Sequence, residues 1–453
     1  MQITVDDIQK FGINDFLGKD FECKCGKIHS VKLDNLIIEE GAIEKLPMVL
    51  KNFGYKNVFL VADNNTYDAA GREVEKILIS AGFSIEKLIY ERAYELVPDE
   101  VAIGEFLVSY NKKMEVILTV GSGVLNDISK YMSFMLDIPS IVVATAPSMD
   151  GYASSISALM LKDTKISVQS TPPKAIIGDI DILRKAPMDM ILAGFGDMLG
   201  KYSALRDWKL ANIVIGEYYC DVVKNMIELS VNRCAAEVNL LAKRDGDAVG
   251  HLMEGLMIVG IAMSFVGNSR PASGAEHHMS HFWELSFLME GRKAIPHGIK
   301  VGIATFIINN IANKFIEMDI DFENIGDDLK ILDRDKWKNE INRVYKKAAP
   351  EILSLNDGNI DDMVEDRKSR QMVIRDNWED IVHVIREFPD ADKIQMLLKR
   401  AGIPIRPQDV GIDREMVQDA ILYAKELRQK YTILQLLGDM GLLKYFAYMD
   451  GLY

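Results

Sequence analysis

Short apolar runs alternate with amphipathic segments between about residues 57 and 180. The runs NVFLVAD, SIEKLIYE, EVILTVGSG and SIVVATAPS are separated by stretches whose apolar residues recur at helical spacing. Strand and helix in strict alternation predict parallel strands joined by crossover helices. Residues 58–61 and 116–120 are almost entirely apolar, which is typical of strands that are covered on both faces. This part of the chain therefore predicts an α/β domain with a parallel sheet.

The pattern changes after about residue 185. Long segments such as GDMLGKYSALRDWKLANIVIG and HLMEGLMIVGIAMSFVGNS repeat apolar residues at helical spacing, and no strand is predicted beyond Ile182. The chain has 453 residues, whereas single hydrophobic cores stop growing at roughly 250 to 300 residues. We expect two tightly joined domains, an α/β domain over 1–185 that binds a dinucleotide and an all-helical domain over 186–453 that binds metal and substrate.

Composition and charge narrow the class of partner. The chain is 48% hydrophobic and carries a formal net charge of −14, and this acidic balance argues against nucleic acid, which requires a basic face. We expect a small-molecule partner. No apolar run approaches the roughly 20 residues that span a bilayer, and the start MQITVDDIQKFGINDF has no hydrophobic signal segment. These features predict a cytoplasmic protein without membrane insertion.

The four cysteines are too few for a disulfide framework. Cys220 and Cys234 are expected to be core thiols in a reducing compartment. Cys23 and Cys25 lie near His29 in FECKCGKIHS, a spacing that supplies three zinc ligands, whereas a structural zinc site has four. A hairpin turned at Gly26 is the favoured interpretation, with zinc as the alternative.

A glycine pair follows one of the predicted buried strands, in TVGSGVLNDISKY. Such a turn lets backbone N–H groups approach a phosphate at a helix N-terminus. The third glycine of the dinucleotide fingerprint is absent, so a nucleotide loop and a simple strand-to-helix turn both remain open. Asp63 ends an earlier strand, where an acid either accepts hydrogen bonds from an adenosine ribose or caps a turn.

Histidine is concentrated in one region: three of the seven lie in PASGAEHHMSHFWE. His277 and His281 are one helical turn apart, so both imidazoles can point at one ion, and His297 in AIPHGIKVG can add a third nitrogen. Asp197, among small and apolar residues in ILAGFGDMLGKY, is the candidate carboxylate. Each residue also has a structural explanation: a capping Asp197, a His278 on the helix surface, or a core histidine bonded to a carbonyl.

Five motifs occur in an order that is known from one group of enzymes. GSGVLND, ATAPSMDGYASS, GFGDMLGK, GAEHHMSH and PHGIKVG resemble the superfamily of metal-dependent polyol dehydrogenases that includes glycerol dehydrogenase and dehydroquinate synthase. The likeness is strongest to the bacterial sn-glycerol-1-phosphate dehydrogenases and runs from about His29 to the C-terminus. The resemblance implies a dinucleotide-binding α/β domain facing a helical metal-binding domain, and NAD(P)H-dependent reduction of dihydroxyacetone phosphate to sn-glycerol 1-phosphate.

The resemblance also assigns roles by position. It implies that the metal ligands are Asp197, His277 and His297, and that His281 and Asp150 face the substrate. It assigns no role to His278, which we expect on the helix surface or behind the ligands. The implied cofactor-binding residues are Asp63, Gly123, Val124, Leu125, Asn126, Asp127, Thr145, Ala146, Pro147, Ser148 and Ser154. NAD(H) is the expected cofactor, with NADP(H) as the alternative, together with one divalent ion, which can be zinc, nickel or iron.

Three other functions are compatible with parts of this pattern. They are an unphosphorylated polyol dehydrogenase, a lyase resembling dehydroquinate synthase, and a metal-binding protein without catalysis. The lyase needs a basic pocket, and no cluster of Lys and Arg stands beside the metal motifs in the sequence. The chain is longer than other dehydrogenases of this type, and the charged helices predicted at about 330–394 hold the excess as an added surface. We expect a homo-oligomer.

Overall fold

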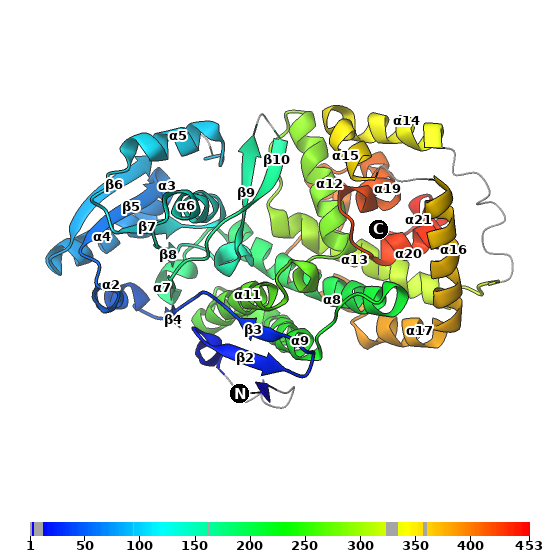
Figure 1. Ribbon diagram of the computed structural model, residues 1–453, viewed down its shortest axis with the longest axis horizontal. Helices are drawn as coiled ribbons and strands as arrows, with labels where there is room; N and C mark the ends of the chain where they lie inside the picture. The colour runs from blue at the N-terminus through cyan, green and yellow to red at the C-terminus, as the bar shows by residue number, and fades with distance from the viewer. Residues whose placement is uncertain (1, 4–11, 94, 162–163, 323–333, 357–359) are drawn as a thin grey trace. The chain divides into compact units, whose positions relative to one another are not determined.

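The computed structural model describes residues 2–3, 12–93, 95–161, 164–322, 334–356 and 360–453 (Figure 1). Contacts divide the chain into two compact units, Met1–Met198 with Asp221–Asn268, and Leu199–Cys220 with Ser269–Tyr453. Helix α8 (Met188–Ile215) runs unbroken through the point where the first segment ends. The expected functional boundary after residue 185 stays a prediction. Most of the expected signal-free N-terminal segment, residues 4–11, lies outside the described residues.

The first unit contains a six-stranded sheet in which every strand pair is parallel. Its strand order is β4-β11-β8-β7-β5-β6. The strands are β4 (Asn35–Glu39), β5 (Asn57–Asp63), β6 (Ser84–Tyr90), β7 (Val116–Gly121), β8 (Ser140–Ala144) and β11 (Ala175–Asp179). The parallel α/β prediction is confirmed. The five-residue strands β4 and β11 were not among the four predicted runs.

Both faces of this sheet are covered, as the apolar runs predicted. Along β5, Val58 and Leu60 pack in one core cluster with α2 and α4, whereas Phe59 and Val61 pack in the other with α5 and α6. This follows from the strand period of two residues. The helices of the first unit are α2 (Leu46–Asn52), α3 (Asn64–Thr66), α4 (Arg72–Ser80), α5 (Glu100–Ser109), α6 (Gly123–Leu136), α7 (Ile180–Leu183), α9 (Asp221–Ala236), α10 (Val238–Leu241) and α11 (Gly246–Val266).

Two smaller sheets complete the first unit. Strands β9 (Ile156–Leu161) and β10 (Thr164–Gln169) form an antiparallel hairpin. Strand β1 (Gln2–Ile3) pairs with β2 (Asp20–Cys23), which pairs antiparallel with β3 (Ile28–Ser30). The turn between β2 and β3 contains Gly26 at φ 86°, a left-handed conformation that glycine adopts without steric cost. The expected hairpin at Gly26 is therefore confirmed.

The second unit is helical throughout its described residues. It contains α12 (Ala275–Met289), α13 (His297–Glu317), α14 (Arg334–Tyr345), α15 (Ala349–Leu355), α16 (Ile360–Asp376), α17 (Trp378–Glu387), α18 (Ala391–Ala401), α19 (Arg414–Tyr423), α20 (Ile433–Asp439) and α21 (Leu443–Ala447). In the described chain no strand follows β11, as predicted. Of the charged segment at 330–394, residues 330–333 and 357–359 lie outside the described residues, and its role as an added surface stays a prediction.

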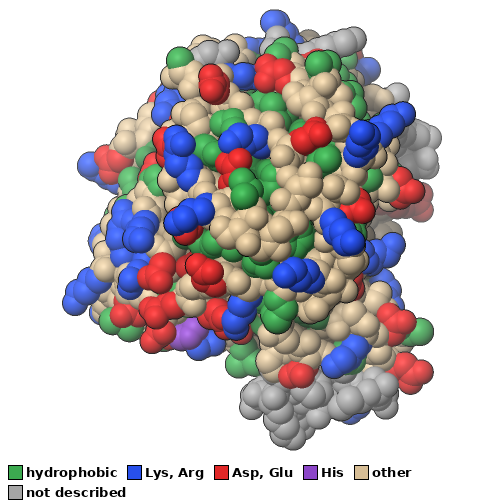
Figure 2. Space-filling model, turned by 90° about the vertical axis from the view of Figure 1, so that its left-hand side faces the viewer, with side chains coloured by type: hydrophobic (Ala, Val, Ile, Leu, Met, Phe, Trp, Pro, Cys, Tyr) green, Lys and Arg blue, Asp and Glu red, His purple; other side chains and the backbone are tan. Residues whose placement is uncertain are grey.

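Within the described part of the chain, one helix is long and apolar enough to cross a membrane by length and composition. It is α11, and 72% of its most apolar window is buried inside the protein, as in the core helix of a globular unit. It contacts α9, with which it lies side by side (Figure 1). The cytoplasmic location stays a prediction. On the face drawn in Figure 2, acidic and basic side chains are interspersed.

Candidate active site

The glycine turn joins β7 to α6 in the first unit. A Cβ on Gly121 would lie 2.4 Å from Leu125 Cδ1, so the turn cannot close with a larger residue. Helix α6 then begins at Gly123, directly after the strand end. Its first backbone N–H groups have no partner within the helix and are suited to a phosphate. This geometry fits a dinucleotide pyrophosphate.

The side chains at 123–127 have different surroundings. Leu125 lies in the core cluster that packs α5 and α6 against the sheet, together with Phe59 and Val61 of β5. Asp127 contacts the Lys130 ammonium at 3.2 Å and accepts a hydrogen bond from Ala158 N at 3.2 Å, so it ties α6 to β9. Asn126 is fully buried, and its side-chain amide has no hydrogen-bond partner among the described residues. An unpartnered buried amide beside a helix N-terminus supports a polar ligand there.

The loop after β8 is held in place by buried contacts. Thr145 N donates to Gly121 O at 3.1 Å, which fastens the loop to the glycine turn. Tyr152 donates to Ala146 O at 2.7 Å. A Cβ on Gly194 of α8 would lie 1.8 Å from Pro147 O. The predicted cofactor residues Thr145, Ala146, Pro147 and Ser148 therefore lie beside the predicted glycine loop.

Lys130 is a residue that sequence analysis missed. Its ammonium is buried and donates to Gly151 O at 2.8 Å, Ser154 Oγ at 3.1 Å and Ile156 O at 2.7 Å. Burial lowers the pKa of Lys130, although the Asp127 carboxylate opposes this shift. Ser154, a predicted cofactor contact, is thus held in a polar network centred on Lys130. No motif marks this lysine, since it is one more polar residue in a helix.

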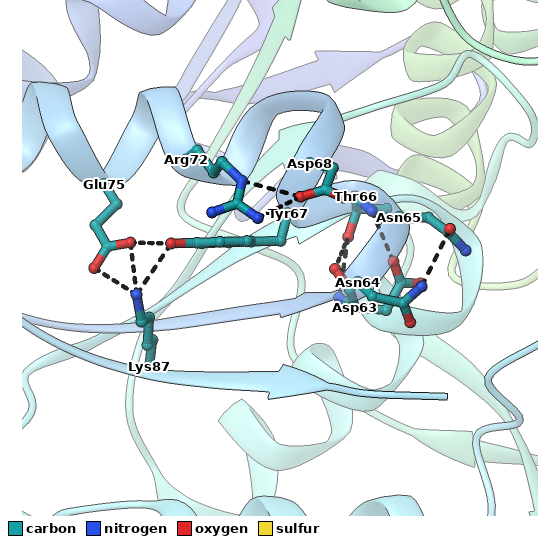
Figure 3. A network of polar contacts seen from close by, with 9 residues as sticks. All are labelled: Asp63, Asn64, Asn65, Thr66, Tyr67, Asp68, Arg72, Glu75 and Lys87. Atoms are coloured by element: carbon teal, nitrogen blue, oxygen red, sulfur yellow. Dashed lines mark hydrogen bonds and ion pairs between the residues drawn. The ribbon is translucent and has the colours of Figure 1, made fainter. Parts of the chain in front are cut away.

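Asp63 caps a helix at the end of β5. Its Oδ1 accepts a hydrogen bond from Thr66 N at 2.7 Å, and Asp63 N donates to Thr66 Oγ1 at 3.0 Å (Figure 3). This is a capping box. The carboxylate is half-buried, and its ribose-binding role stays a prediction.

A cavity of about 640 Å³ adjoins this cap at the ends of β5 and β6. Arg72 and Lys87 line it, and Figure 3 shows Arg72 on Asp68 and Lys87 between Glu75 and Tyr67. Arg92 also lines the cavity and contacts Glu105 at 2.6 Å. Each of these three cations therefore already has a carboxylate partner.

Three of the predicted site histidines converge in the second unit. His277 and His281 lie on α12, and His297 is the first residue of α13. The ring centroids are 5.2 Å apart for His277 and His297, 5.4 Å for His281 and His297, and 6.1 Å for His277 and His281. The predicted helix over His277 is confirmed. Imidazoles this close can share one ion.

Glu276 orients the His277 ring. Its Oε1 lies 2.7 Å from His277 Nδ1 and accepts from Gly274 N at 2.8 Å. Burial alone would raise the pKa of Glu276, but the bonds from His277 and Gly274 outweigh burial and lower it. A carboxylate on one ring nitrogen leaves the other, Nε2, for a metal, an arrangement common at metal sites. No pattern in the sequence singles out Glu276.

A second possible set of metal ligands shares His281 and His297 with the histidine cluster and adds a carboxylate. His281, Glu284 and His297 each offer an atom within 4.8 Å of the others. Glu284 Oε2 is also 3.3 Å from the Lys300 ammonium, one turn beyond His297. A basic residue thus does stand beside the metal motifs, although no cluster was visible in the sequence.

His278 is not on the helix surface, and that alternative was wrong. Its side chain is fully buried, and neither ring nitrogen has a hydrogen-bond partner among the described residues. Burial, together with the charges of Lys430 and Arg428, lowers the pKa of His278 well below its ordinary value. The helix face that carries His278 is packed against protein because α12 is surrounded by other helices of its unit, including α13 and α19.

Asp150 and Asp197 are brought together in the first unit. Asp150 N donates to Asp197 Oδ2 at 3.2 Å. Asp197 is fully buried in the third turn of α8, so it does not cap that helix. A buried carboxylate requires a charged or hydrogen-bonding partner, which fits a role at a cation.

Comparison with curated proteins identifies relatives along most of the chain. The glycerol-1-phosphate dehydrogenase [NAD(P)+] of Halalkalibacterium halodurans is 32% identical over 421 residues, which cover 92% of this chain and 96% of the relative. The chain belongs to the glycerol-1-phosphate dehydrogenase family. It is therefore an oxidoreductase that acts on a small molecule. The protein of the same name from Pyrococcus furiosus is 33% identical but covers 60% of this chain and 77% of its own.

The family model for iron-containing alcohol dehydrogenase matches residues 37–187. Among solved structures, glycerol dehydrogenase from Schizosaccharomyces pombe has a TM-score of 0.59 at 14% identity and covers 92% of this chain and 90% of its own. Sulfoacetaldehyde reductase from Bifidobacterium kashiwanohense, in complex with NAD+, has a TM-score of 0.59 at 13% identity. These likenesses show the fold. Since the Halalkalibacterium relative is almost fully covered, its length is close to that of this chain, and the extra length is not peculiar to this chain.

Proposed function

We propose that this oxidoreductase reduces dihydroxyacetone phosphate to sn-glycerol 1-phosphate with NADH, with NADPH as the alternative cofactor, and depends on one divalent metal ion. The observation that carries the proposal is the convergence of His277, His281 and His297 beside a carboxylate that orients one of them. The names of the full-length relatives support the substrate and the cofactor.

The proposed metal ligands are Asp197, His277 and His297. Glu276 holds His277 Nδ1 and leaves Nε2 for the ion. In the rival set, Glu284 is partly neutralised by Lys300, which makes it a weaker ligand. One carboxylate and two imidazoles suit zinc, nickel or iron and leave a position for substrate.

Helix α8 supports the choice of Asp197. Gly200, three residues further along this helix, belongs to the second unit, where a Cβ on it would lie 2.6 Å from Val301 Cγ1 and 3.4 Å from Glu276 Cγ. Residues three apart in a helix share a face. We therefore propose that the Asp197 carboxylate projects from the same side of α8 as Gly200. Gly200 packs against Glu276, the residue before His277.

The proposed mechanism assigns one task to each group. When bound, the ion would polarise the substrate carbonyl while the nicotinamide supplies hydride. His281, half-buried beside His277 and His297, delivers a proton to the substrate oxygen directly or through a water, a role that imidazole side chains often take in general acid catalysis. Asp150 contacts the substrate, and its backbone N–H holds Asp197 in place.

The experiment that tests the proposal measures NADH oxidation by the metal-loaded protein with dihydroxyacetone phosphate and with dihydroxyacetone. We expect turnover of the phosphate and the sn-1 product. Faster turnover of dihydroxyacetone would instead establish a plain polyol dehydrogenase. Binding of NADH and metal without turnover of either substrate would indicate a metal-binding protein without catalysis. A lyase would also fail to oxidise NADH with these two substrates. The homo-oligomer stays a prediction.

Replacing His281 with alanine should preserve metal content and reduce kcat by about 10²- to 10⁴-fold, the usual contribution of a general acid. The reason is that His281 is proposed to face the substrate, one turn beyond the ligand His277. Elemental analysis and steady-state kinetics measure the two effects. Glu284→Gln is the matched control and should also keep its metal. Loss of metal from both variants would establish the His281, Glu284 and His297 set instead.

Asp63→Asn and Asp63→Ser should relax a preference for NADH, by improving kcat/KM with NADPH about tenfold. The wild-type carboxylate would repel the extra phosphate of NADPH, and the nearby cations Arg72, Lys87 and Arg92 are already paired. Both substitutions retain a side chain that can accept from Thr66 N, so they separate charge from capping. Kinetics with both cofactors measure the effect.

Asp99→Asn is the control for Asp63. Asp99 caps α5 by accepting from Ala102 N at 2.9 Å, and it does not line the cavity beside β5. Its substitution should leave the cofactor preference unchanged. If wild type uses both cofactors equally, or if the Asp63 variants behave like Asp99→Asn, Asp63 is only a helix cap.

A further inference from the structure

We propose that Cys23, Cys25, His29 and Cys220 bind a structural zinc ion at the N-terminal hairpin, apart from the proposed catalytic metal. Nothing in the reductase mechanism uses these residues. Four ligands of the CCHC type make a closed tetrahedral site with no position for substrate. The argument starts from the hairpin, which by itself supplies three of the ligands.

The hairpin gathers these three side chains around a short turn. Cys23 ends β2, His29 lies in β3, and Cys25 is in the turn between them. Gly26 N donates to Cys23 O at 3.0 Å, and Cys23 N donates to Lys27 O at 3.1 Å. The ligand atoms of Cys23, Cys25 and His29 all lie within 4.8 Å of one another. The left-handed Gly26 permits the tight turn that brings them together.

His29 is oriented as a metal ligand would be. Its Nδ1 lies 3.0 Å from Phe265 O, and its ring stacks on Phe265 at 5.1 Å between centroids. A carbonyl only accepts hydrogen bonds, so Nδ1 carries the proton and the lone pair is on Nε2. This is the usual support for a metal-binding histidine.

The distance between His29 and Cys25 fits zinc. Nε2 and the Cys25 Sγ are 3.4 Å apart. With Zn–N of about 2.0 Å and Zn–S of about 2.3 Å, tetrahedral geometry places a nitrogen and a sulfur ligand roughly 3.5 Å apart. The two atoms therefore already have the separation that one bound zinc ion would impose.

The fourth ligand follows from the helix pair behind the hairpin. Helices α9 and α11 are antiparallel neighbours. His251 of α11 contacts Glu237, the residue after α9, at 2.7 Å, whereas Glu254, further along α11, contacts Arg233, further back along α9, at 3.2 Å. Twelve residues before Arg233 is Asp221, the start of α9, and twelve after Glu254 is Val266, the end of α11. The start of α9 thus lies at the end of α11 that carries Phe265, on which His29 stacks.

Cys220 is joined to Asp221 by a peptide bond, so the chain delivers its thiol to this end of the helix pair. Its side chain is 1% exposed. Three thiolates and one imidazole favour zinc over harder divalent ions. They would leave the complex with one net negative charge, which the exposed Lys24 and Lys27 of the same hairpin offset. The zinc would link the N-terminal hairpin to the start of α9.

The test compares zinc content in the full-length protein and five variants by elemental analysis. Wild type should hold one zinc that survives Asp197→Asn, which removes only the proposed catalytic ligand. Cys25→Ser and Cys220→Ser should each lose that zinc, whereas Cys234→Ser, another buried cysteine, should keep it. Cys220→His, which restores a ligand, should recover zinc. A zinc ion retained in Cys220→Ser, or no zinc left in Asp197→Asn, would overturn the proposal.

A measurement on wild type keeps the proposal testable if the serine variants do not fold. A thiol reagent is added to the protein while an indicator dye follows released zinc. Release of one zinc in step with the modification of three thiols is expected. Cobalt substitution should also give the near-ultraviolet absorption of thiolate-to-cobalt charge transfer. Modification of these thiols without zinc release, or a cobalt protein lacking that absorption, would contradict the proposal.

Discussion

Asp197→Asn, His277→Ala and His297→Ala should each lose the catalytic metal and lower kcat/KM by about 10³-fold or more, while NADH still binds. Polarisation of a carbonyl by a metal contributes several kcal/mol to transition-state stabilisation, and each 1.36 kcal/mol is a factor of ten in rate. The proposed dinucleotide site is built from other elements, β7 with α6 and the segment after β8. Elemental analysis, kinetics and fluorescence titration with NADH measure the three quantities.

The control is His383→Ala, which removes an exposed histidine of α17. It should leave metal content, activity and NADH affinity unchanged. A ligand-set variant with full metal occupancy would remove that residue from the set. Loss of NADH affinity in all three variants would mean that they disturb the fold and not only the metal site.

Gly194→Ala should weaken NADH binding about tenfold, equivalent to ~1.4 kcal/mol, and lower the free energy of unfolding by about 1–3 kcal/mol. The added Cβ would lie 1.8 Å from Pro147 O, so either α8 or the loop after β8 must move. That loop also holds Thr145, which is bonded to Gly121 O. Titration with NADH and denaturant unfolding measure the effects.

Gly104→Ala is the matched control in α5. A Cβ there meets no atom within 4 Å, and alanine is favoured over glycine inside a helix by roughly 0.5–1 kcal/mol. This variant should be slightly more stable than wild type and bind NADH normally. Unchanged NADH affinity in Gly194→Ala would show that the loop after β8 does not contact the cofactor.

The parallel sheet could be predicted because its signal is local. Apolar runs such as NVFLVAD are covered on both faces, and each residue reports that burial through its own type. Strands β4 (NLIIE) and β11 (AIIGD) were missed because their apolar runs are only three residues long, which is too short to distinguish a buried strand from other apolar segments. The helices α8 and α11 were recognisable from the spacing of their apolar residues.

The site was predictable only as a set of candidates. The spacing of His277, His281 and His297 indicated convergence, and the ring distances agree with it. The positioning groups Glu276 and Lys130 were invisible, because an acid in a helix or a lysine in a helix is normally a surface residue. His278 was misplaced for the same reason: helical periodicity gives a face but does not say what packs against that face.

The sequence by itself determined the α/β and helical classes, the glycine turn at Gly121 and the residue types of the proposed metal site, since these depend on residue type and short spacing. Only the tertiary structure decided which partners meet across long stretches of chain. It paired Asp150 with Asp197, set Pro147 against Gly194, and placed His29 at the end of α11 near the start of α9. Such contacts arise from packing between elements, and no local pattern encodes them.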